Sequence, residues 1–476
     1  MKNDYDLVAV ENFLWTPHIQ TSLDILISSK CKKKAFCYLD IDNPDNPDIP
    51  NNRFKIFGKK RIIKKISKIL NNHKIDLIKI PQDPNYLKSY NYDKIKLRKF
   101  DDLKDYKING YNIGFGIASS LVDRFKQRDP AIKDIKKKIL TRYIKTSHQV
   151  LISIEKLHKI YKFKKILTFN GRFAHAAVIK NFCYKKKIKT LFHERTDSKF
   201  RYFLNRRPVH DMEWWREDAV KLWHSSKLKK ETKYKIGQKW FENRLNNKYA
   251  DGLEHRKFQV KGKIPSFIKK EKKIVTFFSH SDEEYAYCQE LKHPIFKDQR
   301  KAIIWLINYF KGKKNIDFIL RIHPNLLNKN IKDIKWWHNL KRKFNFNNFY
   351  LIKSNSKIDS YSLVKNSDVA INFCSSSIAL ESTYLGTPSI IIGDSQYRST
   401  DCAYHPMNIN ELKNLLKQKK IKPKRKKNAL KFAFFRSTYG YDFKYYKPVN
   451  NYEGKFLGEK FDYYPEFISY LKKIIS

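Results

Sequence analysis

The chain is poor in glycine, proline and acidic residues. Only 14 Gly and 16 Pro occur among 476 residues, and 47 Asp and Glu stand against 100 Lys and Arg, which gives a formal net charge of +53. Apolar residues make up 41% of the chain and aromatic residues 15%, which excludes a disordered protein. A chain of this length exceeds one ordinary core and predicts two domains of roughly 200 residues each.

Cysteine is scarce and scattered. No Cys-x-x-Cys pair and no histidine cluster at zinc spacing occurs, so neither a disulfide framework nor a structural metal is indicated. The beginning "MKNDYDLVAVENF" carries acids where a signal peptide has bases, and no apolar run reaches the ~18 residues of a membrane span. We therefore expect a cytoplasmic protein. The six cysteines are Cys31, Cys37, Cys183, Cys288, Cys374 and Cys402.

The excess of lysine has three interpretations. Lys, Asn, Ile, Tyr and Phe are abundant together, as in a coding sequence rich in A and T, so a solvated basic surface is the simplest reading. A groove for nucleic acid is the second. In the third, a basic face holds an enzyme against the inner face of an anionic membrane or attracts phosphorylated substrates.

Short apolar runs alternate with amphipathic stretches in both halves, which is typical of βα units. We expect an α/β fold of two Rossmann-like domains that face each other across a cleft. The segment "VKGKIPSFIKKEKK" resembles a linker. The predicted limits are 1–265 for the N-terminal domain, 266–430 for the C-terminal domain, and 431–476 for a segment that packs back and ends in the helix "YPEFISYLKKIIS".

Ligands of open parallel sheets bind outside the carboxyl ends of the strands, so the polar residues that follow predicted strands are candidates for a site. In the N-terminal half they are His18, Asn170, Gly171, Arg172, His193, Glu194 and Arg195. In the C-terminal half they are Ser279, His280, Ser281, Asp282, Glu283, Arg321, His323, Pro324, Ser375, Ser376 and Ser377.

The uncharged stretch "VAINFCSSSIALESTYLGTPSIIIGD" predicts a strand, a serine triplet, a helix and a second strand. Serine hydroxyls and free backbone N–H groups at a helix start can bind an anion such as a phosphate. Glu381 lies four residues beyond Ser377, about 6 Å along the helix, where it can meet a ribose diol. The alternative is that the serines only cap the helix and Glu381 is solvated. His323 follows another strand, where its imidazole can donate to a phosphate oxygen.

The order "SHSDEEYA", "LRIHPN", "SYSLVKNSDVAINFCSSSIALESTYLGTPSII" resembles the nucleotide-sugar-binding half of capsule and surface polysaccharide glycosyltransferases with the GT-B fold. The His-Pro pair followed by a serine motif is similar to that of bacterial sialyl- and Kdo-transferases. "FNGRFAHAAVIK" and "LFHER" look like the N-terminal half of the same proteins. The resemblance implies a donor site formed by Ser281, Glu283, Arg321, His323, Ser375, Ser376, Ser377 and Glu381.

The implied reaction is an inverting, metal-independent transfer of a sugar from a nucleotide sugar to a capsular, surface or lipid-linked acceptor, with no cofactor. The general base must come from the N-terminal strand ends, and Glu194 is the leading candidate, with His18 and Asp197 as alternatives. Glu194 has a purely structural interpretation too, as the partner of Arg195 or Arg172. Asn170 and Arg172 are expected to hold the acceptor, an anionic or lipid-linked glycan.

Two other functions stay open. An RNA-binding protein could stack bases on the aromatic and basic segment "KFAFFRSTYGYDFKYYKP", residues 431–448. A nucleotide-sugar 2-epimerase would share the GT-B fold. We rank both below the transferase, because neither explains the uncharged serine unit together with the Asn-Gly-Arg segment, and nucleic-acid binding explains neither feature.

Overall fold

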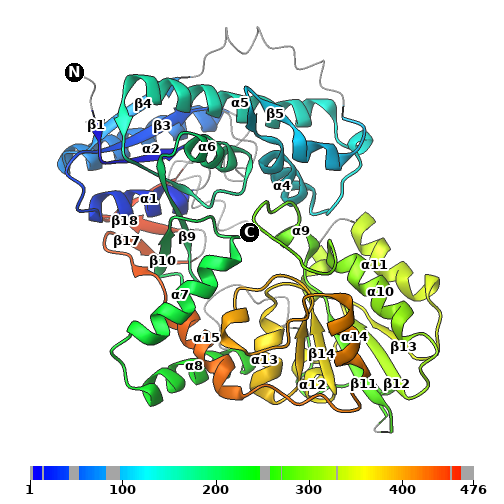
Figure 1. Ribbon diagram of the computed structural model, residues 1–476. Helices are drawn as coiled ribbons and strands as arrows, with labels where there is room; N and C mark the ends of the chain where they lie inside the picture. The colour runs from blue at the N-terminus through cyan, green and yellow to red at the C-terminus, as the bar shows by residue number, and fades with distance from the viewer. Residues whose placement is uncertain are drawn as a thin grey trace.

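The computed structural model describes residues 4–12, 16–41, 53–81, 97–246, 258–269, 271–328, 331–450 and 453–462. Two separate β-sheets, each flanked by helices, organise this part of the chain, with the first sheet at the top of Figure 1 and the second at the bottom. Three small pairings, β1 with β7, β5 with β6, and β17 with β18 and β19, accompany them.

The first sheet has the order β16-β10-β9-β8-β2-β3-β4, with parallel pairing from β9 to β4 and antiparallel pairing of β10 with β9 and β16. Apolar strands such as "LVAVE" form its centre because both faces are covered by helices. The strands are β2 Leu7–Glu11, β3 Lys34–Asp40, β4 Asp76–Pro81, β8 Lys165–Phe169, β9 Lys189–Arg195, β10 Arg201–Asn205 and β16 Tyr441–Asp442.

The second sheet is entirely parallel, in the order β13-β12-β11-β14-β15. Its strands are β11 Lys273–Phe278, β12 Ile316–Arg321, β13 Phe349–Ile352, β14 Val369–Asn372 and β15 Ser389–Ile391. Counted along the chain, its five strands and the five parallel strands of the first sheet share the order 3-2-1-4-5 of the Rossmann fold, which reverses direction next to the first strand. The predicted fold class, two Rossmann-like domains facing across a cleft, is confirmed.

Helices cover both faces of each sheet and bury separate apolar cores. Those around the first sheet are α1 Thr16–Ser28, α2 Arg53–Asn72, α4 Gly114–Phe125, α5 Lys137–Ile160 and α6 Ala174–Lys185. Those around the second are α9 Asp282–Tyr285, α10 Gln299–Phe310, α11 Ile331–Lys343, α12 Ser360–Lys365, α13 Ser377–Leu385 and α14 Ile409–Lys417. The short 3-10 helices are η2 Phe100–Asp105, η3 Ile132–Asp134, η5 Pro324–Asn328 and η6 Arg398–Thr400.

Three further helices, α7 Met212–Ser225, α8 Lys230–Leu245 and α15 Lys426–Thr438, pack together beside α13 (Figure 1). Gly237 permits the close approach of α8 to α15, because a Cβ there would lie 2.4 Å from the Leu430 carbonyl oxygen. Phe432, Phe434 and Phe435 are buried in this packing. These three rings of the segment proposed for RNA stacking are therefore part of the core.

The segment after α15 returns to the first sheet, and α15 itself crosses the predicted limit at residue 430. The small strands there are β17 Tyr446–Pro448, β18 Gly454–Phe456 and β19 Glu459–Lys460. The buried carboxylate of Asp24, in α1, accepts hydrogen bonds from the backbone N–H groups of Lys444 at 3.1 Å, Tyr445 at 2.7 Å and Tyr446 at 2.8 Å. The predicted helix "YPEFISYLKKIIS" lies outside the described residues.

The remaining short strands are β1 Asp4–Tyr5, β5 Lys107–Ile108, β6 Tyr111–Asn112 and β7 Lys162–Phe163. No helix among the described residues is both long enough and apolar enough to cross a bilayer.

Candidate functional site

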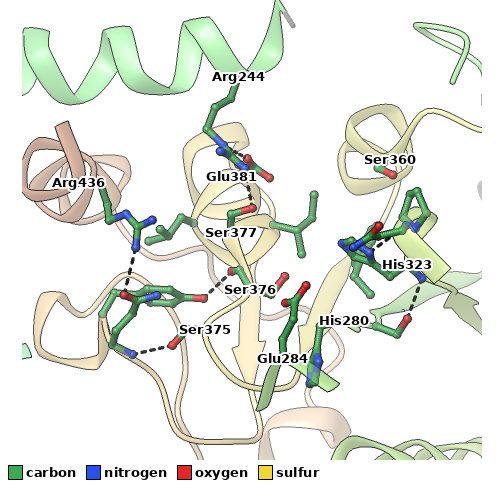
Figure 2. Close-up of a pocket in the computed structure, with 18 of the residues that line it drawn as sticks. Arg244, His280, Glu284, His323, Ser360, Ser375, Ser376, Ser377, Glu381 and Arg436 are labelled. Carbon is green, nitrogen blue, oxygen red and sulfur yellow. Dashed lines mark hydrogen bonds and ion pairs between the residues drawn. The ribbon is translucent and has the colours of Figure 1, made fainter. Parts of the chain in front are cut away.

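A cavity of about 430 Å³ opens at the carboxyl ends of β11, β12 and β14, beside the point where the strand order of the second sheet reverses. It is the place where open α/β sheets bind ligands. Its walls also include Asp197 from the first domain and Trp240 from α8. Figure 2 shows two further wall residues, Arg244 from α8 and Arg436 from α15. The cavity therefore lies in a cleft that both domains and the helices between them line.

The predicted serine triplet lines this cavity at the start of α13. Cys374 before it adopts a left-handed φ of 58°, which turns the chain from β14 toward the helix. The Ser375 hydroxyl accepts from the Gln396 N–H at 2.9 Å, and the Ser376 carbonyl accepts from the Tyr397 hydroxyl at 2.6 Å. The first N–H groups of a helix have no partner within the helix, so this turn can bind an anion.

Arg321 and His323, both predicted, line the same cavity. Arg321 is 1% exposed, and burial lowers its pKa to about 10. One of its nitrogens donates to the Lys353 carbonyl, whereas Nε and Nη2 have no hydrogen-bond partner among the described residues. A buried cation with unused donors is costly unless a ligand supplies acceptors.

The ring of His323 is oriented by its own loop. Its Nδ1 accepts from the Asn325 N–H at 3.2 Å, and its backbone N–H donates to the Ser279 hydroxyl at 2.8 Å. In the neutral ring the proton is therefore on Nε2. The neutral ring of His323, which lines the cavity, therefore keeps an N–H donor.

Glu381 lies one turn into α13, as predicted, and is 2% exposed. Its Oε1 accepts from Arg244 Nε at 2.5 Å and from the Tyr361 hydroxyl at 2.9 Å, and Arg244 also donates to Ser377 at 2.8 Å (Figure 2). Arg244 and Tyr361 thus orient the carboxylate at the cavity wall, where it can accept from a diol.

A second cavity, of about 310 Å³, adjoins the first. It is lined by Glu194 and by aromatic side chains, among them Trp215 and Tyr439. Residues that line both cavities are Asp197, Tyr285, Ser375, Gln396 and Arg436. The Asp197 carboxylate accepts two hydrogen bonds from the Arg436 guanidinium, one of them from Nε at 2.7 Å, so an ion pair forms part of the shared wall.

The Glu194 carboxylate accepts from Asn170 Nδ2 at 2.8 Å and from the Arg195 N–H at 3.1 Å. Burial raises its pKa despite these hydrogen bonds, which is the direction that a general base requires. Asn170 and Gly171 both have left-handed backbones, with φ of 52° and 83°. A Cβ on Gly171 would lie 2.8 Å from a ring carbon of Phe192, so this turn requires glycine.

Arg172 connects the two domains. Its Nε donates to the Ser119 hydroxyl in α4 at 2.6 Å. Its Nη1 and Nη2 donate to backbone carbonyls of α9 and the residue after it, those of Glu283 at 2.6 Å, Glu284 at 3.0 Å and Ala286 at 3.3 Å. The guanidinium therefore holds α9, which contributes Glu284 and Tyr285 to the first cavity.

Not every predicted residue faces a cavity. His18 is buried, and the centre of its ring lies 3.7 Å from the centre of the Phe169 ring. Burial lowers the pKa of His18, and the charges of His193 and Arg195 lower it further. Ser281, just before α9, and Glu283, within α9, are buried. The predicted residues that line neither the first nor the second cavity are His18, Asn170, Arg172, Ser281 and Glu283. Their assigned roles stay predictions.

Several lining residues were not predicted from the sequence. Glu284 extends toward the serine triplet, beside His280 (Figure 2). His280, which was predicted as a strand-end residue, donates from Nδ1 to the Ser281 carbonyl at 2.9 Å, and its buried Nε2 has no partner among the described residues. Arg244 and Arg436 come from helices that follow no strand, so a search of strand ends could not find them. The only signal for Arg244 is its spacing of four from Trp240, over whose ring it lies at 4.6 Å.

No protein-family model and no curated protein matches the chain. Similar solved structures include the UDP-GlcNAc 2-epimerase from Neisseria meningitidis bound to UDP-GlcNAc, at 10% identity and a TM-score of 0.26, over 91% of this chain and 99% of that chain. The spinosyn rhamnosyltransferase SpnG complexed with spinosyn aglycone has 8% identity and a TM-score of 0.25, over 90% and 95%. Anabaena Alr3699/HepE in complex with UDP and glucose has 9% identity and a TM-score of 0.25, over 92% and 96%. These TM-scores are too low to indicate a shared fold. The strand order of the two sheets shows the fold instead.

Proposed function

We propose that the first cavity binds a nucleotide sugar and that the protein is a glycosyltransferase. One observation carries the donor site: Arg321, whose Nε and Nη2 have no partner among the described residues, lines the same cavity as the N-terminus of α13 and Glu381, at the switch point of a Rossmann-like sheet. The first two suit a diphosphate and the third suits a ribose diol. Positive charge at the phosphates stabilises the leaving group, so the proposal includes no metal.

The second cavity is proposed to bind the acceptor, a surface, capsular or lipid-linked glycan. Glu194 lines it and is proposed as the general base that takes the proton from the attacking hydroxyl. Attack from this side is opposite to the departing phosphate, so the transfer inverts the anomeric carbon. Asp197, at the wall between the cavities, is the alternative base, although its pairing with Arg436 opposes that role.

A nucleotide-sugar 2-epimerase is the second candidate, because His280 and Glu284 place a basic nitrogen and a carboxylate in the donor cavity itself. An epimerase needs no second substrate, whereas the adjoining second cavity favours the transferase. The two functions differ in their products.

The first experiment is calorimetric titration with UDP-, CMP- and GDP-sugars. We expect one of them to bind, and binding to weaken in a His323→Ala, Glu381→Ala double variant; unchanged affinity would refute the site. The sugar that binds is then incubated with and without glycan acceptors. Release of free nucleotide that depends on an acceptor supports the transferase, and a 2-epimer formed without an acceptor supports the epimerase.

A further inference from the structure

The edge of the first sheet carries an aromatic face. β10 and β16 pair antiparallel with Tyr202 opposite Tyr441, and the Phe443 N–H donates to the Phe200 carbonyl at 3.3 Å. In this register the side chains of Phe200, Tyr202, Tyr441 and Phe443 share one face of the pair. Tyr202 is buried, with ring centroids 5.7 Å from Tyr441 and 5.1 Å from Phe443. Phe200 and Tyr441, at the outside, are 54% and 57% exposed.

Lys199 links Phe200 to a third exposed apolar residue, Val449. Lys199 Nζ donates to the Val449 carbonyl at 3.0 Å and lies 5.3 Å from the centre of the Phe200 ring. Val449 is 61% exposed. Lys444 and Lys447, on the same returning segment, are exposed too. We call Phe200, Tyr441 and Val449, with Lys199, the edge patch.

The composition of the edge patch fits the interface of a membrane. Adjacent exposed apolar side chains of this size indicate a surface that meets a partner. Aromatic rings prefer the boundary between lipid head groups and acyl chains, and lysines beside them attract anionic head groups. The formal net charge of +53 gives the whole molecule the complementary sign.

The edge patch is close to the second cavity. Phe200 follows Asp197 by three residues in the hairpin between β9 and β10, and Tyr441 follows Tyr439 by two. Asp197 and Tyr439 line the second cavity. Three residues of chain span at most about 10 Å, so the patch begins within that distance of the cavity wall. Gly440 fixes the turn between Tyr439 and Tyr441, since a Cβ there would lie 2.5 Å from the Tyr202 carbonyl oxygen.

We propose that the edge patch docks the protein on an anionic lipid bilayer, so that the second cavity receives the sugar head group of an acceptor that stays anchored in that bilayer. The docking surface is independent of the reaction. The identity of the acceptor as a lipid-linked glycan rests on the proposed function.

The test is co-sedimentation of the full chain with vesicles of phosphatidylcholine alone and with vesicles that also contain phosphatidylglycerol. We expect binding to the anionic vesicles only, weakened by salt. A Phe200→Ser, Tyr441→Ser variant should bind about tenfold more weakly, because two half-exposed aromatic side chains no longer insert. The matched control is Val260→Ser with Ile264→Ser, whose side chains are 49% and 40% exposed and lie among Lys261 and Lys263.

Three outcomes would overturn the proposal. The first is no binding to either vesicle, full retention of binding by the edge-patch variant, which would reflect net charge alone, or equal loss of binding in the edge-patch and control variants. The second is a dimer in solution that the edge-patch variant dissociates. The third is binding of single-stranded RNA, but not of vesicles, that depends on Phe200 and Tyr441. Calorimetry with nucleotide sugars, measured without lipid, tests the proposed function separately, because neither residue lines the donor cavity.

Discussion

Replacing Arg172 by alanine removes the guanidinium that joins the two domains. The change deletes five hydrogen bonds of 2.6 to 3.5 Å, to the Ser119 hydroxyl, to His210 Nε2 and to the carbonyls of Glu283, Glu284 and Ala286. A hydrogen bond to a charged group contributes about 1.5–3 kcal/mol, but water can replace the guanidinium at the more exposed carbonyls. We therefore expect a net loss of about 3 kcal/mol from a total stability of about 5–15 kcal/mol.

Urea unfolding followed by tryptophan fluorescence measures this loss. The matched control is Arg207→Ala. The ion pairs of Arg207 among the described residues are with the exposed carboxylates of Glu213 and Glu217 and with the half-buried Asp211. Such surface pairs should contribute less than about 1 kcal/mol to stability. Arg172→Ala should also weaken donor binding, because α9, which Arg172 holds, contributes Glu284 and Tyr285 to the first cavity. If the two variants unfold at the same urea concentration, the role of Arg172 as a connection between domains is wrong.

Arg321→Met should weaken nucleotide binding in calorimetry roughly 10- to 100-fold, since a buried cation with two unused donors is lost; a change below twofold would contradict its role. Because burial raises the pKa of Glu194 and the base must be ionised, turnover should rise with pH through that raised pKa. A pH–rate profile whose acid limb persists unshifted in Glu194→Gln would exclude Glu194 as the base. Gly171→Ala should cost about 2 kcal/mol in urea unfolding, from its φ of 83° and the close ring of Phe192; a neutral effect would show that the turn can relax.

The fold could be predicted because both sheets are built from short apolar strands that alternate with amphipathic helices. The C-terminal part of the first cavity followed from the same rule, since Arg321 ends β12 while His323 and the serine triplet follow strands of the same parallel sheet. Local order along the chain was enough to bring them together.

The rest of the site depends on contacts between distant segments. Arg244 reaches Glu381 across 137 residues, and Arg436 reaches Asp197 across 239. Both arginines lie on helices, α8 and α15, that follow another helix along the chain rather than a strand. Arg172 was predicted to hold an acceptor because it follows a strand. In the structure its guanidinium donates hydrogen bonds to the carbonyls of α9. These hydrogen bonds depend on the packing of the two domains, which the sequence alone does not reveal.

The contact of Asp24 with the segment after α15 bears on how the protein is made. The carboxylate is buried in α1, and burial raises its pKa, while its backbone donor at Tyr446 lies 422 residues later in the chain. At about 5–20 residues per second, a ribosome needs roughly 20 to 80 s to synthesise that interval. Throughout this time the N-terminal sheet has no β16 at its edge and no donors from residues 444–446 for Asp24. Until translation has passed α15, the nascent N-terminal domain therefore exposes the edge of β10 and the apolar side chains that later pack against Tyr446. Chaperones bind exposed apolar surfaces of this kind.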